Sequence, residues 1–186
     1  MASRKRQASK GKKVNPKFWV FCEGKTEEAF VCYLKVRYRL PFKIIPKIIG
    51  QNISDDLIDR HKHKREIHSK DKTYLMYDAD VSNVLERLKN IKNAKLLASN
   101  PTLEYWFLLH YKNQTAQIRE EECIRQLSNR NQNKYKKGLI DEKLKQHLDI
   151  KQSEACKRAK QTVLYNNPSS NIFEFIADLE KARKDK

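Results

Sequence analysis

The sequence predicts an α/β fold: a mainly parallel four-stranded sheet flanked by helices, with a C-terminal helical extension. Through residue 112, apolar runs of strand length alternate with amphipathic helical patterns. From residue 115 onward only helical patterns are present. Alternation of this kind is typical of a parallel sheet covered on both faces. We therefore expect an α/β core over residues 16–112 and a helical extension over 113–186, packed together as one structural domain.

The first strand is predicted at residues 18–22, which form an uninterrupted apolar run. A half-exposed strand would alternate apolar and polar residues, so this run predicts a strand buried on both faces. The run ends at Glu23 and Gly24. Thr26 is then expected to cap a helix whose first turn contains Glu27, where the helix dipole favours negative charge.

The remaining elements of the core follow the same alternation. Pro46 cannot donate to a strand ladder, so the second strand is expected at an edge of the sheet, or broken at this residue. The third strand is followed by Asp78 and Asp80, and Thr102 is expected to cap the last helix of the core. The predicted elements are a helix at 27–39, strand 42–49, polar helix 52–70, strand 73–77, helix 84–91, strand 95–99 and a helix from 102.

The helical extension is predicted to contain three helical segments. A loop rich in Asn and Lys is expected at 129–138, between a loosely patterned helix and a longer one at 139–165. Residues 166–170 read as a break, after which Asn171 and Glu174 are spaced as a capping box for the final helix.

The charge balance indicates a polyanionic partner. Lys and Arg number 40 against 23 Asp and Glu, a formal net charge of +17. Nucleic acid is the simplest partner for such an excess, although a basic protein without one is the alternative. Residues 1–15 are basic and poor in apolar side chains, which predicts a disordered arm. No apolar run approaches a membrane span and no signal peptide is evident, so we expect a cytoplasmic protein.

Three carboxylates are predicted to meet at one edge of the sheet. Glu23 follows one strand, and Asp78 and Asp80 follow another. Ligands of open α/β sheets bind at the carboxyl ends of the strands. Oxygen ligands of this kind suit Mg²⁺ or Mn²⁺, with Glu23 as a metal ligand or a general base. The alternative for the Asp pair is a turn that caps the next helix.

Four segments carry a resemblance to a known family. Glu23-Gly24-Lys25-Thr26-Glu27 and Asp78-Ala79-Asp80 resemble a TOPRIM domain. Residues 99–110 (SNPTLEYWFLLH) and 167–171 (NPSSN) resemble the RloB-like family, and the match spans roughly residues 17–180. The resemblance implies a Mg²⁺-dependent endonuclease with Glu23, Asp78 and Asp80 as catalytic and metal-binding residues.

The resemblance also implies supporting site residues and partners. Glu27, Asn100 and Glu104 are expected to support the site. RNA, with tRNA as one candidate, is favoured over DNA, partly because the chain is small. Related proteins resemble effectors of prokaryotic antiphage defence that act with an ATPase partner.

Other residues are candidates for nucleic-acid contacts. Lys134, Tyr135, Lys136 and Lys137 interleave an aromatic ring with positive charge, which suits stacking on single-stranded or looped nucleic acid. The alternative is a solvated charged face. His110 is a phosphate-contact candidate or a structural histidine at a helix end. Lys25 would either contact phosphate or offset local negative charge. A non-cleaving module that binds nucleic acid or an ATPase is the alternative function, and the sequence leaves the oligomeric state open.

Overall fold

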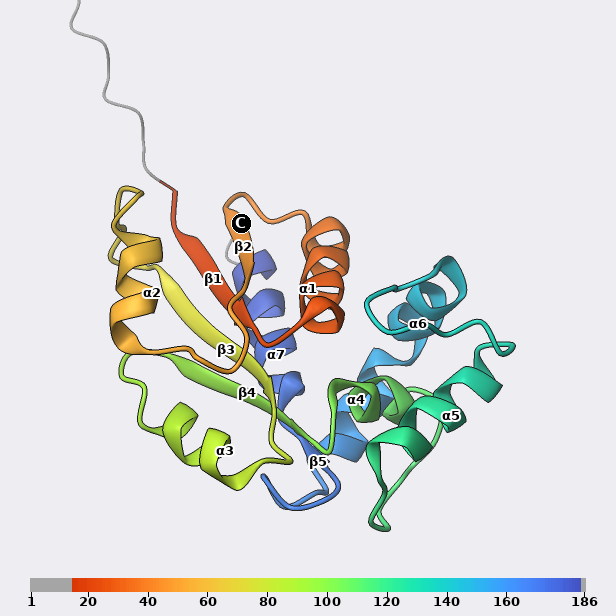
Figure 1. The fold of residues 1–186 in the computed structure, drawn as a ribbon. Helices are drawn as coiled ribbons and strands as arrows, with labels where there is room; N and C mark the ends of the chain where they lie inside the picture. Colours follow the sequence, from red (N-terminus) through yellow and green to blue (C-terminus); the bar gives the residue numbers. More distant parts are fainter. Residues whose placement is uncertain (1–14, 185–186) are drawn as a thin grey trace, which may run out of the picture.

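The computed structural model describes residues 15–184, and most of the predicted basic arm lies outside them. It confirms the α/β class but adds a fifth strand (Figure 1). The sheet has the order β2-β1-β3-β4-β5, in which the first four strands are parallel and β5 is antiparallel to β4. The strands are β1 (Lys17–Cys22), β2 (Lys43–Ile48), β3 (Lys72–Asp78), β4 (Lys95–Asn100) and β5 (Ser169–Ser170).

Helices cover both faces of this sheet (Figure 1). One face carries α2 and α3, and the other carries α1 and α7, with α4, α5 and α6 grouped beside them. The helices of the described chain are α1 (Lys25–Tyr38), α2 (Asp55–Lys62), α3 (Ser82–Lys89), α4 (Leu103–Leu109), α5 (Glu120–Arg130), α6 (Glu142–Ala159) and α7 (Ile172–Lys184). None of these helices, which all fall within residues 15–184, has both the length and the apolar character of a membrane span.

Strand β1 is buried on both faces, as its apolar run predicts. Phe18, Val20 and Cys22 pack into the core beneath α1 and α7, whereas Trp19 and Phe21 pack into the core beneath α2 and α3. This alternation follows from the two-residue period of a strand. The first core also includes side chains of α4, α5 and α6, so the α/β part and the helical extension share it.

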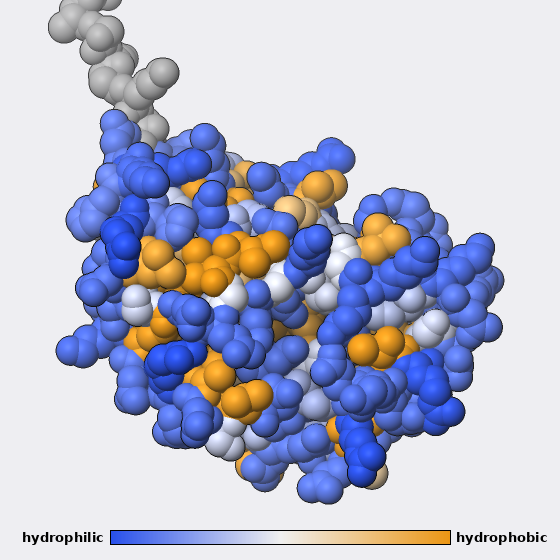
Figure 2. Space-filling model, in the orientation of Figure 1, coloured by the Kyte–Doolittle hydropathy of each residue, from blue (hydrophilic) through white to orange (hydrophobic). Residues whose placement is uncertain are grey.

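Strand β2 lies at the edge, which confirms one of the two expectations for Pro46. Ile49 donates its N–H to Cys22 O (3.0 Å), and amides alternate sides along a strand, so the amide of Lys47 also faces β1. The nitrogen of Pro46 therefore faces the free side of β2. Because proline has no N–H, it disfavours pairing with a further strand on that side. Figure 2 shows a hydrophobic strip over the β2 side of the sheet, where Ile48 is 41% exposed.

Strand β5 occupies the last two residues of the break predicted at 166–170. Ser99 and Ser170 share a hydroxyl hydrogen bond of 2.9 Å, which fixes the end of β4 against β5. Asn171 binds the backbone of β4, accepting from Ala98 N and donating to Leu96 O. Its side-chain oxygen thus fastens β4 instead of capping α7, and the predicted capping box is wrong.

Candidate active site

A cleft opens at the carboxyl edge of the sheet, where β1, β3 and β4 end. It has a volume of about 330 Å³ and is bounded by these strand ends, the first turn of α1, the start of α4 and the loop before α6. We call it the carboxylate cleft, because four acidic side chains line it. The lining residues are Glu23, Gly24, Lys25, Thr26, Glu27, Asp78, Thr102, Glu104, Lys137 and Gly138.

Glu23 and Asp78 are linked to each other through the backbone. The N–H of Asp78 donates to Glu23 Oε2 (3.0 Å), and the side chain of Gln51 donates to Glu23 Oε1 (3.0 Å). Asp78 Oδ1 in turn accepts from the N–H of Leu103, the first residue of α4 (2.9 Å). The side chains at the ends of β1 and β3 are therefore held in fixed orientations at neighbouring positions.

Glu27 and Glu104 complete the acidic lining from helices α1 and α4. Glu27 accepts a hydrogen bond from Gly24 N (2.9 Å) and is 5% exposed. Glu104 is fully buried and accepts from two hydroxyls, Thr102 Oγ1 at 2.5 Å and Tyr135 Oη at 2.7 Å. Thr102 thus bonds Glu104 and does not cap α4 with its side chain.

The cleft concentrates negative charge. Burial, followed by the nearby charges of Glu104 and Glu23, raises the pKa of Glu27 to about 7. Burial, followed by the charges of Glu27, Glu23 and Glu104, also raises the pKa of Asp78 well above its usual range. Buried carboxylates that repel one another in this way favour either a bound proton or a bound cation.

The chemistry of these side chains fits a hard divalent cation, since every acidic donor is a carboxylate oxygen. In the arrangement seen across residues 15–184, however, no three His, Cys, Asp or Glu side chains already converge as a metal site. The donor types therefore match Mg²⁺ or Mn²⁺, while coordination would require the carboxylates to turn toward the ion.

Two predicted site residues lie elsewhere. Asp80 is exposed and is not among the lining residues, so the cleft brings Glu23 and Asp78 together without Asp80. Strand β3 ends at Asp78, and Asp80 lies two residues beyond it, in the segment that leads to α3. Asn100 is not a lining residue either. Its side-chain amide donates to Ala79 O and Tyr165 O, which supports the loops around the site.

The predicted nucleic-acid contacts divide into buried and exposed residues. Tyr135 is 8% exposed and bonds Glu104, so its ring is unavailable for stacking on a base. His110 is 2% exposed, and burial lowers its pKa to about 3, which supports the structural alternative for this residue. All four lysines are exposed, namely Lys25, Lys134, Lys136 and Lys137, and of these Lys25 and Lys137 also line the cleft.

Two contacts of the site are not predicted from the sequence. Gln51 comes from the segment after β2, and no motif marks it as a partner of Glu23. Thr26 was expected to cap α1, but Gly24 occupies that position and Thr26 Oγ1 accepts from Gly138 N (3.0 Å). The pairing of Thr26 with Gly138 joins residues far apart in the chain, and local sequence patterns carry no signal for such pairs.

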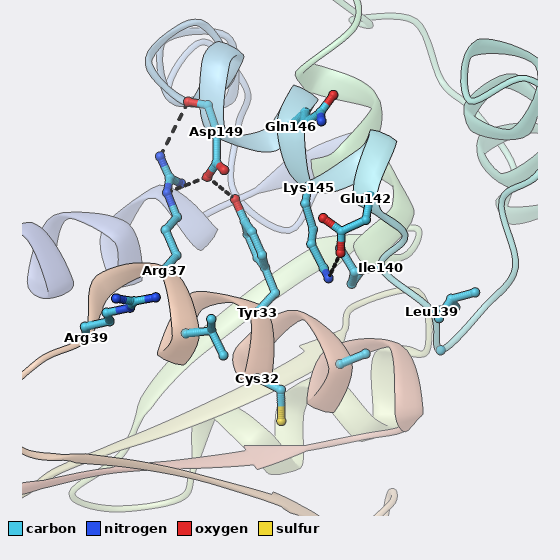
Figure 3. Close-up of a pocket in the computed structure, with 13 residues that line it drawn as sticks. Cys32, Tyr33, Arg37, Arg39, Leu139, Ile140, Glu142, Lys145, Gln146 and Asp149 are labelled. Carbon is cyan, nitrogen blue, oxygen red and sulfur yellow. Dashed lines mark hydrogen bonds and ion pairs between the residues drawn. The ribbon is translucent and has the colours of Figure 1, made fainter.

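A second and larger hollow lies between α1 and α6 (Figure 3). Its volume is about 850 Å³, and Tyr33 and Arg37 of α1 point toward Asp149 of α6 at one side. Tyr33 donates to Asp149 Oδ1 (2.5 Å), and Arg37 pairs with the same oxygen (2.6 Å). These contacts hold the helical extension to the α/β part.

The fold and the cleft define a class of protein: an α/β protein with a carboxylate cluster at the carboxyl edge of a mainly parallel sheet. Comparison with family models matches residues 18–179 to the RloB-like proteins, and the chain belongs to that family. The match covers both the α/β part and the helical extension. Neither the curated proteins nor the solved structures contain a significant match to the chain.

Proposed function

We propose that this RloB-like protein is a metal-dependent endonuclease that cleaves RNA in preference to DNA. One observation carries the proposal: Glu23, Glu27, Asp78 and Glu104 line a single cleft at the sheet edge where α/β proteins bind their ligands. The net charge of +17 supports a polyanionic substrate. The preference for RNA rests on the resemblance to TOPRIM ribonucleases and on the small size of the chain.

The carboxylates of the cleft would bind a cation, and its lysines would contact a phosphate. Glu23 and Asp78 are the first candidates for metal ligands because backbone amides already orient both of them. Glu104 and Glu27 are the supporting carboxylates. Bound Mg²⁺ or Mn²⁺ would supply Lewis-acid polarisation of a phosphate oxygen and activation of water. Lys25 would offset the charge of the phosphate at the mouth of the cleft.

The nuclease proposal is tested with purified protein and three substrates: tRNA, single-stranded RNA and plasmid DNA. Reactions contain Mg²⁺, Mn²⁺ or EDTA. We expect cleavage of RNA that depends on the metal and falls by about 100-fold or more in Asp78→Asn, since loss of a metal ligand removes several kcal/mol of transition-state stabilisation. Asp80→Asn is the matched control and is expected to retain activity within a few-fold. Metal-independent cleavage, or cleavage that persists in Asp78→Asn, would contradict the proposal.

A non-cleaving module that binds nucleic acid is the second candidate. It is favoured by the lack, within the described residues, of three acidic or other ligating side chains already arranged around a metal position. In that case the protein binds RNA with a steep dependence on salt, because bound phosphates release counterions. Substitution of Asp78 would then tighten binding by removing repulsion, and no substrate would be cut.

We also propose a role in prokaryotic antiphage defence beside an ATPase partner, on the basis of family resemblance. Expression of the chain alone, and together with any ATPase encoded beside it, tests this role. Toxicity of the chain alone that requires Asp78 and is relieved by co-expression would support it. Equal growth in both cases would contradict it.

A further inference from the structure

A four-residue segment of the helical extension forms one wall of the carboxylate cleft. We call Tyr135–Gly138 the strap. Its first residue, Tyr135, donates to Glu104 (2.7 Å), and its last, Gly138, donates its backbone N–H to Thr26 (3.0 Å). Both acceptors line the cleft. The strap is therefore fixed at each end to the site itself, and its two central residues, Lys136 and Lys137, have defined positions.

The two central lysines face different surroundings. Both side chains are exposed, but Lys137 lines the cleft with the four carboxylates and Lys136 is not part of the lining. The two residues are adjacent, carry the same charge and lie between the same two anchors. Any difference in their contribution to binding thus reports the position of the side chain relative to the cleft, and not the charge of the loop.

The strap also packs against a second lysine of the cleft, Lys25. Gly138 has φ +77°, and a Cβ placed on it would approach the Cβ of Lys25 to 3.2 Å. A glycine at this position permits both the left-handed backbone and the close approach to the start of α1. Lys25 also lines the cleft, so the lining includes lysines from two separate parts of the chain.

The present partner of Lys137 is a replaceable one. Its ammonium pairs with Glu120 at the start of α5, and the two side chains are 49% and 39% exposed. Ion pairs with this degree of exposure contribute little, because solvent screens them. A phosphate that enters the cleft can therefore replace Glu120 as the partner of Lys137 with little loss of stability. Until then, Glu120 holds the ammonium beside the cleft.

We propose that Lys137 is a phosphate-binding residue of the cleft, which the strap places to receive a backbone phosphate of single-stranded nucleic acid. The proposal rests on the nucleic-acid substrate proposed above, and it assigns the contact to one lysine of the basic loop. The cleft is acidic, so a phosphate entering it meets repulsion that amines at its wall offset. Lys137 contributes this positive charge from the helical extension, outside the α/β part.

Fluorescence anisotropy with labelled RNA tests the assignment. The probe is a single strand of about 20 nucleotides, long enough to span the cleft and its surroundings. The variants Lys137→Ala, Lys137→Arg and Lys136→Ala are made in full-length Glu23→Gln protein and measured in EDTA, so that cleavage plays no part. We expect Lys137→Ala to raise Kd about fivefold and to reduce the slope of log K against log salt by about 0.7, the value for one lost phosphate contact on a single strand.

The matched variants decide the outcome. Lys136→Ala is expected to change Kd by less than about twofold, and Lys137→Arg to bind within about twofold of the parent, since it keeps the charge. Equal weakening by Lys136→Ala and Lys137→Ala, or no effect of Lys137→Ala, would overturn the assignment. Wild-type protein that binds RNA through Lys137 but cuts no substrate would leave the assignment standing and remove the nuclease proposal. Cleavage of RNA together with equal binding by Lys136→Ala and Lys137→Ala would keep the nuclease proposal and remove the assignment to Lys137.

Discussion

The α/β part and the helical extension contribute opposite kinds of chemistry to the carboxylate cleft. All four acidic side chains come from the α/β part, at strand ends or in the first turns of the helices that follow. The extension contributes a hydroxyl, a backbone N–H and an ammonium, from Tyr135, Gly138 and Lys137. The α/β part supplies every carboxylate of the cleft and one lysine, Lys25, and the extension adds further hydrogen-bond donors and a second positive charge.

The two regions meet at three kinds of contact. Phe107 of α4 packs against Phe30 of α1 and the ring of Tyr135, at centroid distances of 5.3 and 6.5 Å. The strap provides the second contact, and the pairs of Asp149 with Tyr33 and Arg37 the third (Figure 3). The first is apolar and buried, whereas the others are polar. We therefore expect the largest energetic coupling between the regions at Phe107.

The strongest test of the shared core is Phe107→Ala. Phe107 is fully buried, and loss of a buried Phe costs about 3–5 kcal/mol of the free energy of unfolding. Urea denaturation followed by tryptophan fluorescence and by far-UV circular dichroism measures this loss. Both signals should report one shifted transition. Val36→Ala, at a site 66% exposed, is the control and should change stability by less than about 0.5 kcal/mol. Two separate transitions would mean that the regions unfold independently.

The next prediction concerns the acidic α/β part, through the pH dependence of stability that Glu27 causes. The pKa of Glu27 rises from 4.5 to about 7 on folding, so the folded protein binds more protons than the unfolded chain between these values. Stability from this group should therefore fall as pH increases from about 4.5 to 7 and stay constant above. At 1.36 kcal/mol per pKa unit the loss is about 3 kcal/mol, and Glu27→Gln should recover it at pH 8.

Denaturation of both proteins from pH 5 to 8, without metal, measures this dependence. The neighbouring Glu28→Gln is the control and should leave the slope of stability against pH unchanged. Because the pKa of Asp78 is raised as well, a shallower slope should remain in Glu27→Gln; a slope as steep as that of the wild type would contradict the assignment to Glu27.

The elements of the α/β part could be predicted because their signals are local. The apolar run before Glu23 and the run before Asp78 each specify a strand and its end. Strand β5 could not be predicted, since it has two residues and depends on Ser170 meeting Ser99, far away in the sequence. Its pairing is a tertiary contact that no periodicity encodes.

The site could be predicted in part for the same reason. Glu23 and Asp78 follow strands that are neighbours in a parallel sheet, so their proximity follows from the fold class. Glu27 and Glu104 were predicted through the family resemblance. The role of Tyr135 was not, because a tyrosine between lysines resembles an exposed stacking residue. Its ring is buried against Phe107, and only the packing of the extension reveals this position.

The smallest expected effect on stability is that of removing the Tyr135 hydroxyl, which the extension donates to Glu104. Tyr135→Phe removes the hydrogen bond to Glu104 and keeps the ring, so stability should fall by about 1–2 kcal/mol. Tyr105→Phe is the matched control, because Tyr105 is buried nearby and its hydroxyl donates only to the backbone oxygen of Gln114 (3.0 Å). Its loss of stability should be about 1 kcal/mol.

Calorimetric titration with Mn²⁺ distinguishes the two tyrosines, since outer groups that orient carboxylate ligands typically affect metal affinity by about 10–100-fold. We expect Mn²⁺ to bind at least about tenfold more weakly to Tyr135→Phe and with unchanged affinity to Tyr105→Phe. Equal affinities in all three proteins would show that the strap closes the cleft without orienting Glu104. The extension would then supply only charge and shape to a site whose carboxylates arrange themselves, and its contribution would rest on Lys137.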